Sequence, residues 1–326
     1  MPGPLMIIGG AEDKLRKRRI LKEFVAAAGG LDARIAVIPT ASSLGPEIVD
    51  VYEALFRAEG AAEVNEVRPQ SREEAADPDL VKRISEATGI FMTGGNQLKL
   101  SAVICGTPVG DAIVEAHARG VVVAGTSAGA SIQSSHMVAF GTPGATPRQR
   151  MTQVAAGLGL LRSTVIDQHF AQRNRYGRLL MIVSQSPSLL GLGIDEDTAA
   201  VVDTDDDGHE VLRVLGRGAV TIMDPAALVT NSYEVKRSAP ILASGVVLHV
   251  LPQGARFDLT TRTLLPVDQV LDPQEAMEIA EAGRDLQQMA RDIAAADASP
   301  TSLRRRLTRN RDARQAIRDD QHGGIT

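Results

Sequence analysis

The sequence predicts an α/β fold with three layers, in which a mostly parallel β-sheet is flanked by helices. Three observations support this prediction. The chain has 326 residues and 44% hydrophobic content, enough for one large buried core. Short apolar runs rich in β-branched residues alternate with helical patterns through its first two-thirds. Such runs are typical of strands buried on both faces, and their alternation with helices is typical of right-handed βαβ units.

The elements expected in this region follow one another without a linker. The strands are Leu5–Ile8, Arg34–Ile38, Glu63–Val67, Ile90–Met92 and Val121–Ala124. The helices are Asp13–Ala28, Pro46–Glu59, Pro78–Glu86 and Val109–Arg119. Farther along, strands occur with few helices between them: Leu189–Ile194, Ala199–Val202, Val211–Leu215, Ala219–Ile222 and Val246–Leu251. We expect this second group to extend the sheet and to add an antiparallel edge.

The end of the chain has a different composition. The segments Gln274–Ala294 and Thr301–Asp319 are rich in Ala, Glu, Gln and Arg, and Pro300 lies between them. We therefore expect an α/β domain at residues 1–270 and a helical, arginine-rich extension at residues 271–326, either a helical hairpin or a tail. Acidic residues dilute the arginines, which favours a solvated or dimer-packing helix over an arm that binds nucleic acid.

Charge and cysteine content restrict the partners and the compartment. The formal net charge of −5 disfavours nucleic acid as the main partner, because binding phosphates requires an excess of Lys and Arg. Cys105 is the only cysteine, so no intrachain disulfide can form, which suits a reducing cytoplasm. The start of the chain lacks the features of a signal peptide, and no run approaches the ~18 apolar residues of a membrane span. We expect a cytoplasmic protein without a nucleic-acid or membrane partner.

One motif carries a candidate nucleophile. Gly125-Thr126-Ser127-Ala128-Gly129 fits the pattern G-x-S-x-G, follows an apolar run and precedes a small-residue stretch, Ala130–Ser135, that could open a helix. In a nucleophile elbow this context lifts the serine into the open, and glycines avoid collisions with the neighbouring backbone. The alternative is a tight turn with an incidental serine. Cys105 lies in an apolar stretch without an elbow, which indicates a small buried residue instead.

A serine nucleophile needs a general base, and the chain has six histidines. His169 differs from the others because it follows the apolar run Thr164–Ile166 and lies in a dense polar block, residues 167–178. Open α/β sheets place their ligands just past the carboxyl ends of strands, where this block lies. His249 is expected in a core strand, and His136 on the helix that leads away from the elbow.

A third group should orient the base, and three adjacent carboxylates follow the strand that ends at Ile194. They are Asp195, Glu196 and Asp197. A metal site is disfavoured, because no further histidine or acid stands at ligand spacing from His169. We expect neither a metal nor a cofactor.

Two glycine pairs follow predicted strands. They lie in Thr93-Gly94-Gly95-Asn96-Gln97 and in Gly9-Gly10-Ala11-Glu12-Asp13. Each pair could point backbone N–H groups at a ligand, but neither forms a nucleotide-binding motif.

Taken together, these motifs resemble the cyanophycinases, which are peptidase E-like serine peptidases. The resemblance rests on segments that occur in family order across roughly residues 5 to 255: Ile8–Lys14, Thr93–Gln97, Gly125–Ala130, Asp167–Phe170 with the arginines that follow, and Gly193–Ala199. It implies a fold related to class I glutamine amidotransferases, a homodimer and a Ser-His-Glu triad. By motif position the triad is Ser127, His169 and Glu196, with an oxyanion hole formed by the backbone N–H groups of Gly95 and Ala128.

The resemblance also implies a substrate, cyanophycin or another β-aspartyl peptide, and release of β-aspartyl-arginine dipeptides. The residues expected to recognise it are Asn96, Gln97, Asp167, Gln168, Arg173, Arg175 and Arg178. Guanidinium groups suit free carboxylates, although arginines can also pair with acids of the chain itself. The alternatives are a related aspartyl or isoaspartyl dipeptidase and a non-catalytic binding paralogue. A glutaminase-type amidotransferase would require Cys at the position of Ser127.

Overall fold

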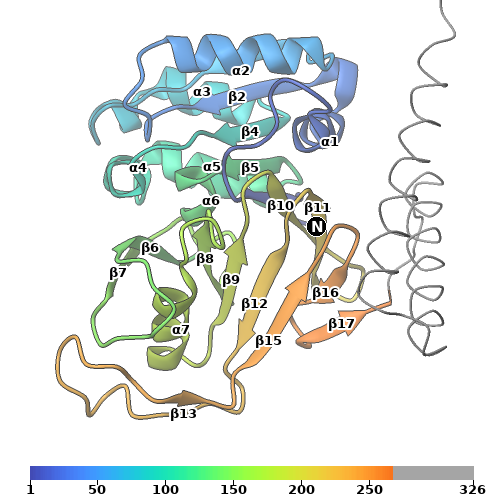
Figure 1. Ribbon diagram of the computed structural model, residues 1–326. Helices are drawn as coiled ribbons and strands as arrows, with labels where there is room; N and C mark the ends of the chain where they lie inside the picture. Colours follow the sequence, from blue (N-terminus) through green and yellow to red (C-terminus); the bar gives the residue numbers. More distant parts are fainter. Residues whose placement is uncertain (267–326) are drawn as a thin grey trace, which may run out of the picture. The chain divides into compact units, whose positions relative to one another are not determined.

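The computed structural model describes residues 1–266, and the strands expected early in the chain form one half of its largest sheet (Figure 1). Five parallel strands lie side by side in the order β1 (Leu5–Ile8), β5 (Val122–Thr126), β4 (Gly89–Met92), β2 (Arg34–Ile38) and β3 (Glu63–Glu66). Every residue of β1, β4 and β5 is buried, as their continuous apolar sequences predict. Because parallel strands end at one edge, the loops after β1, β4 and β5 lie close together.

The other half of this sheet is antiparallel. Its strands continue from β1 in the order β10 (Thr198–Thr204), β11 (Glu210–Gly216), β16 (Arg256–Asp258) and β17 (Thr263–Leu265). The nine-stranded sheet therefore has four parallel and four antiparallel pairings, and the prediction of a mostly parallel sheet is corrected to a mixed one. The physical reason is the short acidic turn between β10 and β11, since a connection of that length can join only antiparallel strands.

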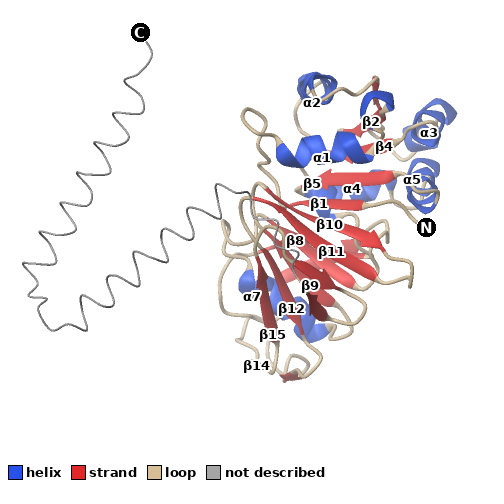
Figure 2. Cartoon of the chain, turned by 90° about the vertical axis from the view of Figure 1, so that its right-hand side faces the viewer, coloured by secondary structure: helices blue, strands red, loops and turns tan. Residues whose placement is uncertain are grey.

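A second sheet contains strands that we expected in the first. Its order is β15 (Val247–Leu251), β12 (Val220–Asp224), β9 (Leu190–Ile194) and β8 (Thr164–Gln168), with β8 and β9 parallel. Figure 2 shows these strands side by side, with helix α7 (Tyr176–Gln185) against them. Two small antiparallel pairs complete the strands: β6 (His136–Gly141) with β7 (Thr152–Ala156), and β13 (Val229–Thr230) with β14 (Ala243–Ser244).

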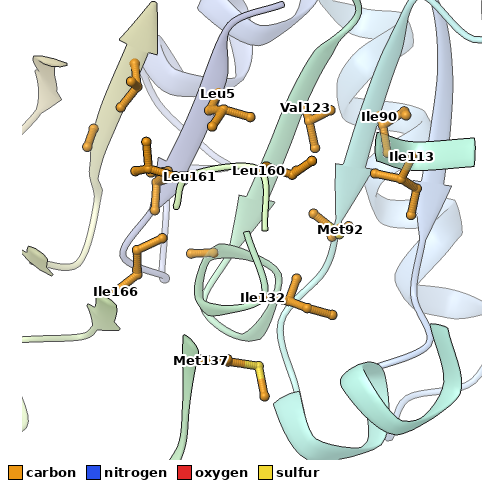
Figure 3. Packing of buried hydrophobic residues seen from close by; sticks show 14 of the residues in the cluster. Leu5, Ile90, Met92, Ile113, Val123, Ile132, Met137, Leu160, Leu161 and Ile166 are labelled. Atoms are coloured by element: carbon orange, nitrogen blue, oxygen red, sulfur yellow. The ribbon is translucent and has the colours of Figure 1, made fainter. Parts of the chain in front are cut away.

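Helices cover both faces of the parallel strands, as the three-layer prediction requires. Phe24 of α1 (Arg19–Ala27) and Phe56 of α2 (Glu47–Ala58) pack with Met6 and Ile8 on one face. On the opposite face, Leu5 and Ile7 join a core that also contains the helices α3 (Pro78–Ser85), α4 (Gln97–Ile104), α5 (Pro108–Ala118) and α6 (Ala128–Ser131). Figure 3 shows part of this core, with Leu5, Val123 and Met92 from neighbouring strands. Leu192 and Ile222 of the second sheet belong to the same core.

Helix α1 begins six residues later than predicted. The Asp13 carboxylate accepts hydrogen bonds from the backbone N–H groups of Leu15, Arg16 and Arg18, which holds the segment as a loop. These bonds, the one from Arg18 first, lower the pKa of Asp13 to about 2. The loop brings Glu12 and Lys14 close to the elbow instead of placing Lys14 on a helix.

Two expectations concern the end of the chain and membrane spans. The predicted domain boundary at residue 270 and the helical extension at residues 271–326 lie outside the described residues. Among the described helices, none is both long and apolar enough to cross a membrane.

Candidate active site

Ser127 lies at a sharp turn between strand β5 and the short helix α6. Its backbone φ of 51° is in the left-handed region, which is uncommon for a residue other than glycine. The Ser127 N–H donates to the Ile8 carbonyl at 2.9 Å, and the Ser127 carbonyl accepts from the Ser131 N–H at 3.1 Å. The serine is left half-buried at the end of the strand, which is the geometry of a nucleophile elbow.

The two glycines of the elbow motif are required by close backbone contacts. A Cβ atom on Gly125 would lie 2.0 Å from the carbonyl oxygen of Gly129, and one on Gly129 would lie 2.2 Å from that of Met92. No side chain fits at either position without moving backbone, which explains the G-x-S-x-G spacing. The helix after the elbow is shorter than expected, since α6 ends at Ser131, so its dipole can add little at Ser127.

The side chains of Ser127, His169 and Glu196 form a continuous hydrogen-bonded series. His169 Nε2 lies 3.0 Å from Ser127 Oγ, and His169 Nδ1 lies 2.7 Å from Glu196 Oε1. Because a carboxylate only accepts, Nδ1 carries the imidazole proton and Nε2 is left to accept from the serine hydroxyl. The arrangement can therefore remove the serine proton while Oγ attacks a carbonyl carbon.

The glycine pair after β1 positions His169. The His169 N–H donates to the Gly9 carbonyl at 2.8 Å, and the residue has a φ of 47°. At Gly10, with a φ of 102°, a Cβ atom would lie 2.3 Å from the Cε1 atom of the imidazole. In this pair, from which we expected N–H groups directed at a ligand, Gly10 thus makes room for the His169 ring, while the Gly9 N–H donates to the Thr198 carbonyl.

The three adjacent carboxylates have separate partners. Glu196 contacts His169, whereas Asp195 accepts hydrogen bonds from the backbone N–H groups of Ala171 and Ala219. Asp197 accepts from the Asp13 N–H at 2.8 Å. The structure thus brings Glu196 to the imidazole, and its two neighbours hold loops in place.

Burial lowers the pKa of His169 below its ordinary value of 6.5. The positive charge of Arg173 lowers it further, while the hydrogen bond with Glu196 acts in the opposite direction without reversing the shift. The imidazole is therefore neutral near pH 7, which is the form that a general base requires.

The two expected oxyanion donors lie near Ser127. Ala128 is the first residue of α6, and the loop of Gly95 passes so close that a Cβ on Gly94 would lie 3.3 Å from the Ser127 Cβ. Gly95 has a φ of 141°, and a Cβ there would lie 2.0 Å from the Ala41 carbonyl oxygen. Within residues 1–266, neither the Gly95 N–H nor the Ala128 N–H has a hydrogen-bond acceptor.

Four of the residues expected to bind substrate form a buried network instead. The fully buried Asp167 carboxylate accepts from Arg178 Nε at 2.6 Å and from Arg175 Nη1 at 3.1 Å. Arg175 also donates to the side chain and carbonyl of Gln168, and Arg178 donates to the Gly141 carbonyl at 3.1 Å. These side chains are already paired with one another, and their direct contact with substrate stays a prediction. The alternative, pairing with acids of the chain, fits the structure.

The other three members of the expected set have different surroundings. The Asn96 side chain caps helix α4 by accepting from the N–H groups of Leu98 and Lys99. Gln97 donates to the Val138 and Ala139 carbonyls of β6. Arg173 is exposed, and among residues 167–178 it is the arginine that a ligand can reach.

A cavity of about 310 Å³ opens beside Ser127. Its lining includes residues that the sequence did not identify as functional: Glu12, Lys14, Ser42, Ser43, Leu44, Ile48 and Tyr52. Glu12 and Lys14 lie in a motif that supported the family resemblance, so the sequence could have indicated that they line the site. Nothing in the sequence indicated this for Tyr52, because its context is that of an ordinary core residue of helix α2.

The remaining candidates do not join the site. His136 begins strand β6 and is exposed, which corrects its expected place on a helix. His249 is half-buried on β15 and packs on Phe257. Burial raises the pKa of the Cys105 thiol, which disfavours the reactive thiolate. In the described part of the chain, no three His, Cys, Asp or Glu side chains gather as metal ligands.

The chain is similar in sequence or fold to several known proteins. A sequence model described as peptidase family S51 matches residues 5–210. A cyanophycinase of Nostoc sp. is 42% identical over 265 residues, covering 80% of this chain and 87% of the relative. A cyanophycinase of Geminocystis herdmanii is 40% identical over 259 residues, covering 79% and 94%. A solved peptidase from an acI-B1 Actinobacterium has a similar fold, with a TM-score of 0.55 and 24% identity over 79% of this chain and 97% of its own.

Proposed function

Since this chain belongs to peptidase family S51 and is a serine-type peptidase, we propose that it degrades cyanophycin, a poly-aspartate with an arginine on each side-chain carboxyl. It acts as an exopeptidase that cleaves the aspartate backbone and releases β-aspartyl-arginine dipeptides. Two things support the proposal: identities of 40–42% with cyanophycinases over about 80% of the chain, and the hydrogen-bonded series at Ser127.

The observation that carries the mechanism is the contact of His169 with both Ser127 and Glu196. In the first step, Ser127 Oγ forms a bond to the scissile carbonyl carbon and its proton passes to His169 Nε2. The C–N bond then breaks, and the same proton goes to the departing amine. Water then gives a proton to His169 and adds to the acyl carbon, the bond from that carbon to Oγ breaks, and His169 returns the proton to Ser127 Oγ. Glu196 holds the imidazole in the required tautomer throughout.

The negative charge of each tetrahedral intermediate is held by the N–H groups of Gly95 and Ala128. Both residues adjoin Ser127, and neither N–H has an acceptor within the described residues. Donors that are already in place need no reorganisation as charge develops, and one such donor contributes roughly 10²–10³-fold to kcat in a serine peptidase.

The direct test is incubation of purified protein with cyanophycin, followed by identification of the products by mass. The proposal predicts β-aspartyl-arginine as the product and no cleavage of casein fragments, whose aspartates carry no arginine on the side-chain carboxyl. Cleavage of α-aspartyl dipeptides without action on the polymer would assign the chain to the related aspartyl dipeptidases. Absence of any hydrolysis would favour a non-catalytic paralogue.

Two further expectations from the resemblance stay with this proposal: a homodimer and a cytoplasmic location. Light scattering during size-exclusion chromatography tests the first, and fractionation of the source cells tests the second. We likewise propose that the fold is related to that of class I glutamine amidotransferases. The basis is a sheet flanked by helices, in which the nucleophile elbow follows a strand.

A further inference from the structure

The cavity beside Ser127 has an ion pair in its wall. Lys14 Nζ lies 2.6 Å from Glu12 Oε1, and both residues line the cavity together with Thr126 and Ser127. The pair plays no part in the proton transfers described above. A charged pair next to a nucleophile nevertheless determines which substrate groups can bind there.

The Glu12 carboxylate is buried and already has three hydrogen-bond donors. Its side chain is 1% exposed, and it accepts from the Tyr52 hydroxyl at 2.6 Å and the Thr126 hydroxyl at 2.6 Å, besides Lys14. Burial alone would raise the pKa of Glu12, but Lys14 and these hydrogen bonds outweigh it, so the pKa is lowered and the group is ionised. A substrate cation would therefore find this acceptor occupied.

The Lys14 ammonium, by contrast, has N–H groups that can still donate to a ligand. Its side chain is 30% exposed, and within residues 1–266 Glu12 is its one hydrogen-bond acceptor, although an ammonium has three N–H groups. The Nζ atom also lies 5.2 Å from the centre of the Tyr52 ring. Glu12 and Tyr52 thus hold the ammonium in one place at the cavity wall, so little side-chain freedom is lost when it binds a ligand.

We propose that Lys14 binds a carboxylate of the substrate in the cavity beside Ser127. A guanidinium is excluded from the same place, because it would approach the Lys14 ammonium and find Glu12 already paired. The hydroxyls of Ser42 and Ser43 on the cavity wall suit an anion as further donors. This inference rests on the proposed function, in which each arginine of the polymer is attached through its amino group and presents a free carboxylate.

The test compares KM and kcat for cyanophycin between wild type and Lys14→Met. Loss of a hydrogen bond to a charged group predicts a roughly 10- to 150-fold rise in KM with kcat changed much less. Lys17→Met is the matched control, because Lys17 is an exposed lysine of the same loop and does not line the cavity. Lys14→Arg keeps the charge and should recover part of the affinity.

A second variant separates ligand binding from simple neutralisation of Glu12. The double variant Glu12→Gln/Lys14→Met removes both charges and leaves no unpaired buried carboxylate. If Lys14 binds the substrate, the double variant keeps the raised KM. A return to the wild-type KM, or a wild-type KM in Lys14→Met itself, would overturn the proposal. Failure of the proposed function would appear differently, as a wild-type protein that leaves cyanophycin intact.

Discussion

His169 Nδ1 lies 2.7 Å from Glu196 Oε1, while the carboxylates on either side of Glu196 bind backbone N–H groups of other loops. The three acids lie in the turn between β9 and β10, where Asp197 has a φ of 51°, and their side chains reach different partners. The contact therefore distinguishes a group that orients the base from two that hold loops, and mutation can separate the two roles.

Glu196→Gln should lower kcat by roughly 10⁴-fold, as loss of the orienting carboxylate does in a serine-protease triad. The amide can donate to Nδ1 and favour the wrong imidazole tautomer. Asp195→Asn should instead leave kcat near wild type and lower the free energy of unfolding by about 1–3 kcal/mol, since it weakens two backbone hydrogen bonds. Steady-state kinetics and urea unfolding of both variants measure the difference, and a reversed pattern would identify Asp195 as the orienting acid.

Replacing Arg173 should shift the pH at which kcat/KM falls on the acid side of the pH profile. Activity requires neutral His169, whose pKa is lowered first by burial and then by Arg173, so kcat/KM should fall with an inflection below pH 6.5. Arg173→Gln removes a positive charge that disfavours the imidazolium, which raises the His169 pKa and moves the limb to higher pH. The shift should shrink at high salt, because Arg173 is exposed. Arg237→Gln, another exposed arginine, serves as the control, and a limb that moves to lower pH would contradict the account.

Arg178→Ala should act on stability rather than on substrate affinity. The substitution leaves the buried Asp167 carboxylate without its bidentate partner, at a cost of roughly 3–5 kcal/mol. Arg173→Ala, at an exposed position, should change the free energy of unfolding by no more than about 0.5 kcal/mol. Urea denaturation measures both values. A well-folded Arg178→Ala variant with a raised KM would instead support the predicted contact of Arg178 with substrate.

Activity should survive dialysis against a strong chelator, because every proton and charge in the proposed mechanism is handled by Ser127, His169, Glu196 and two backbone N–H groups. Loss of activity on chelation, with recovery after one divalent cation is added, would assign a metal to the acidic residues near Glu196.

The sequence anticipated local features better than long-range ones. Strand β1 has the predicted bounds, because four buried apolar residues followed by two glycines have few other interpretations. The assignment of β9 and β12 to the first sheet was wrong, since strand pairing depends on partners distant in the chain. The hairpin β6–β7 was missed, because its strands carry exposed residues such as Phe140 and Val154 that break the buried pattern.

The site was anticipated as far as motifs identified it. Ser127, His169 and Glu196 were chosen from sequence and lie in hydrogen-bond contact. The roles of Arg175 and Arg178 could not be chosen, because an arginine that binds a substrate carboxylate and one that pairs with Asp167 look alike in sequence. Lys14 was not predicted to line the site, because the sequence placed it on a helix. The chain forms a loop there because backbone N–H groups donate to the Asp13 carboxylate.

The most direct test of the central claim is the turnover of cyanophycin by Ser127→Ala. If Ser127 is the nucleophile, kcat should fall by roughly 10⁶-fold, as for the nucleophile of a serine-peptidase triad, with the free energy of unfolding little changed. Ser85→Ala, an exposed serine on helix α3, should keep the wild-type rate. Substantial hydrolysis of cyanophycin by folded Ser127→Ala would contradict the assignment of the nucleophile and the mechanism built on it.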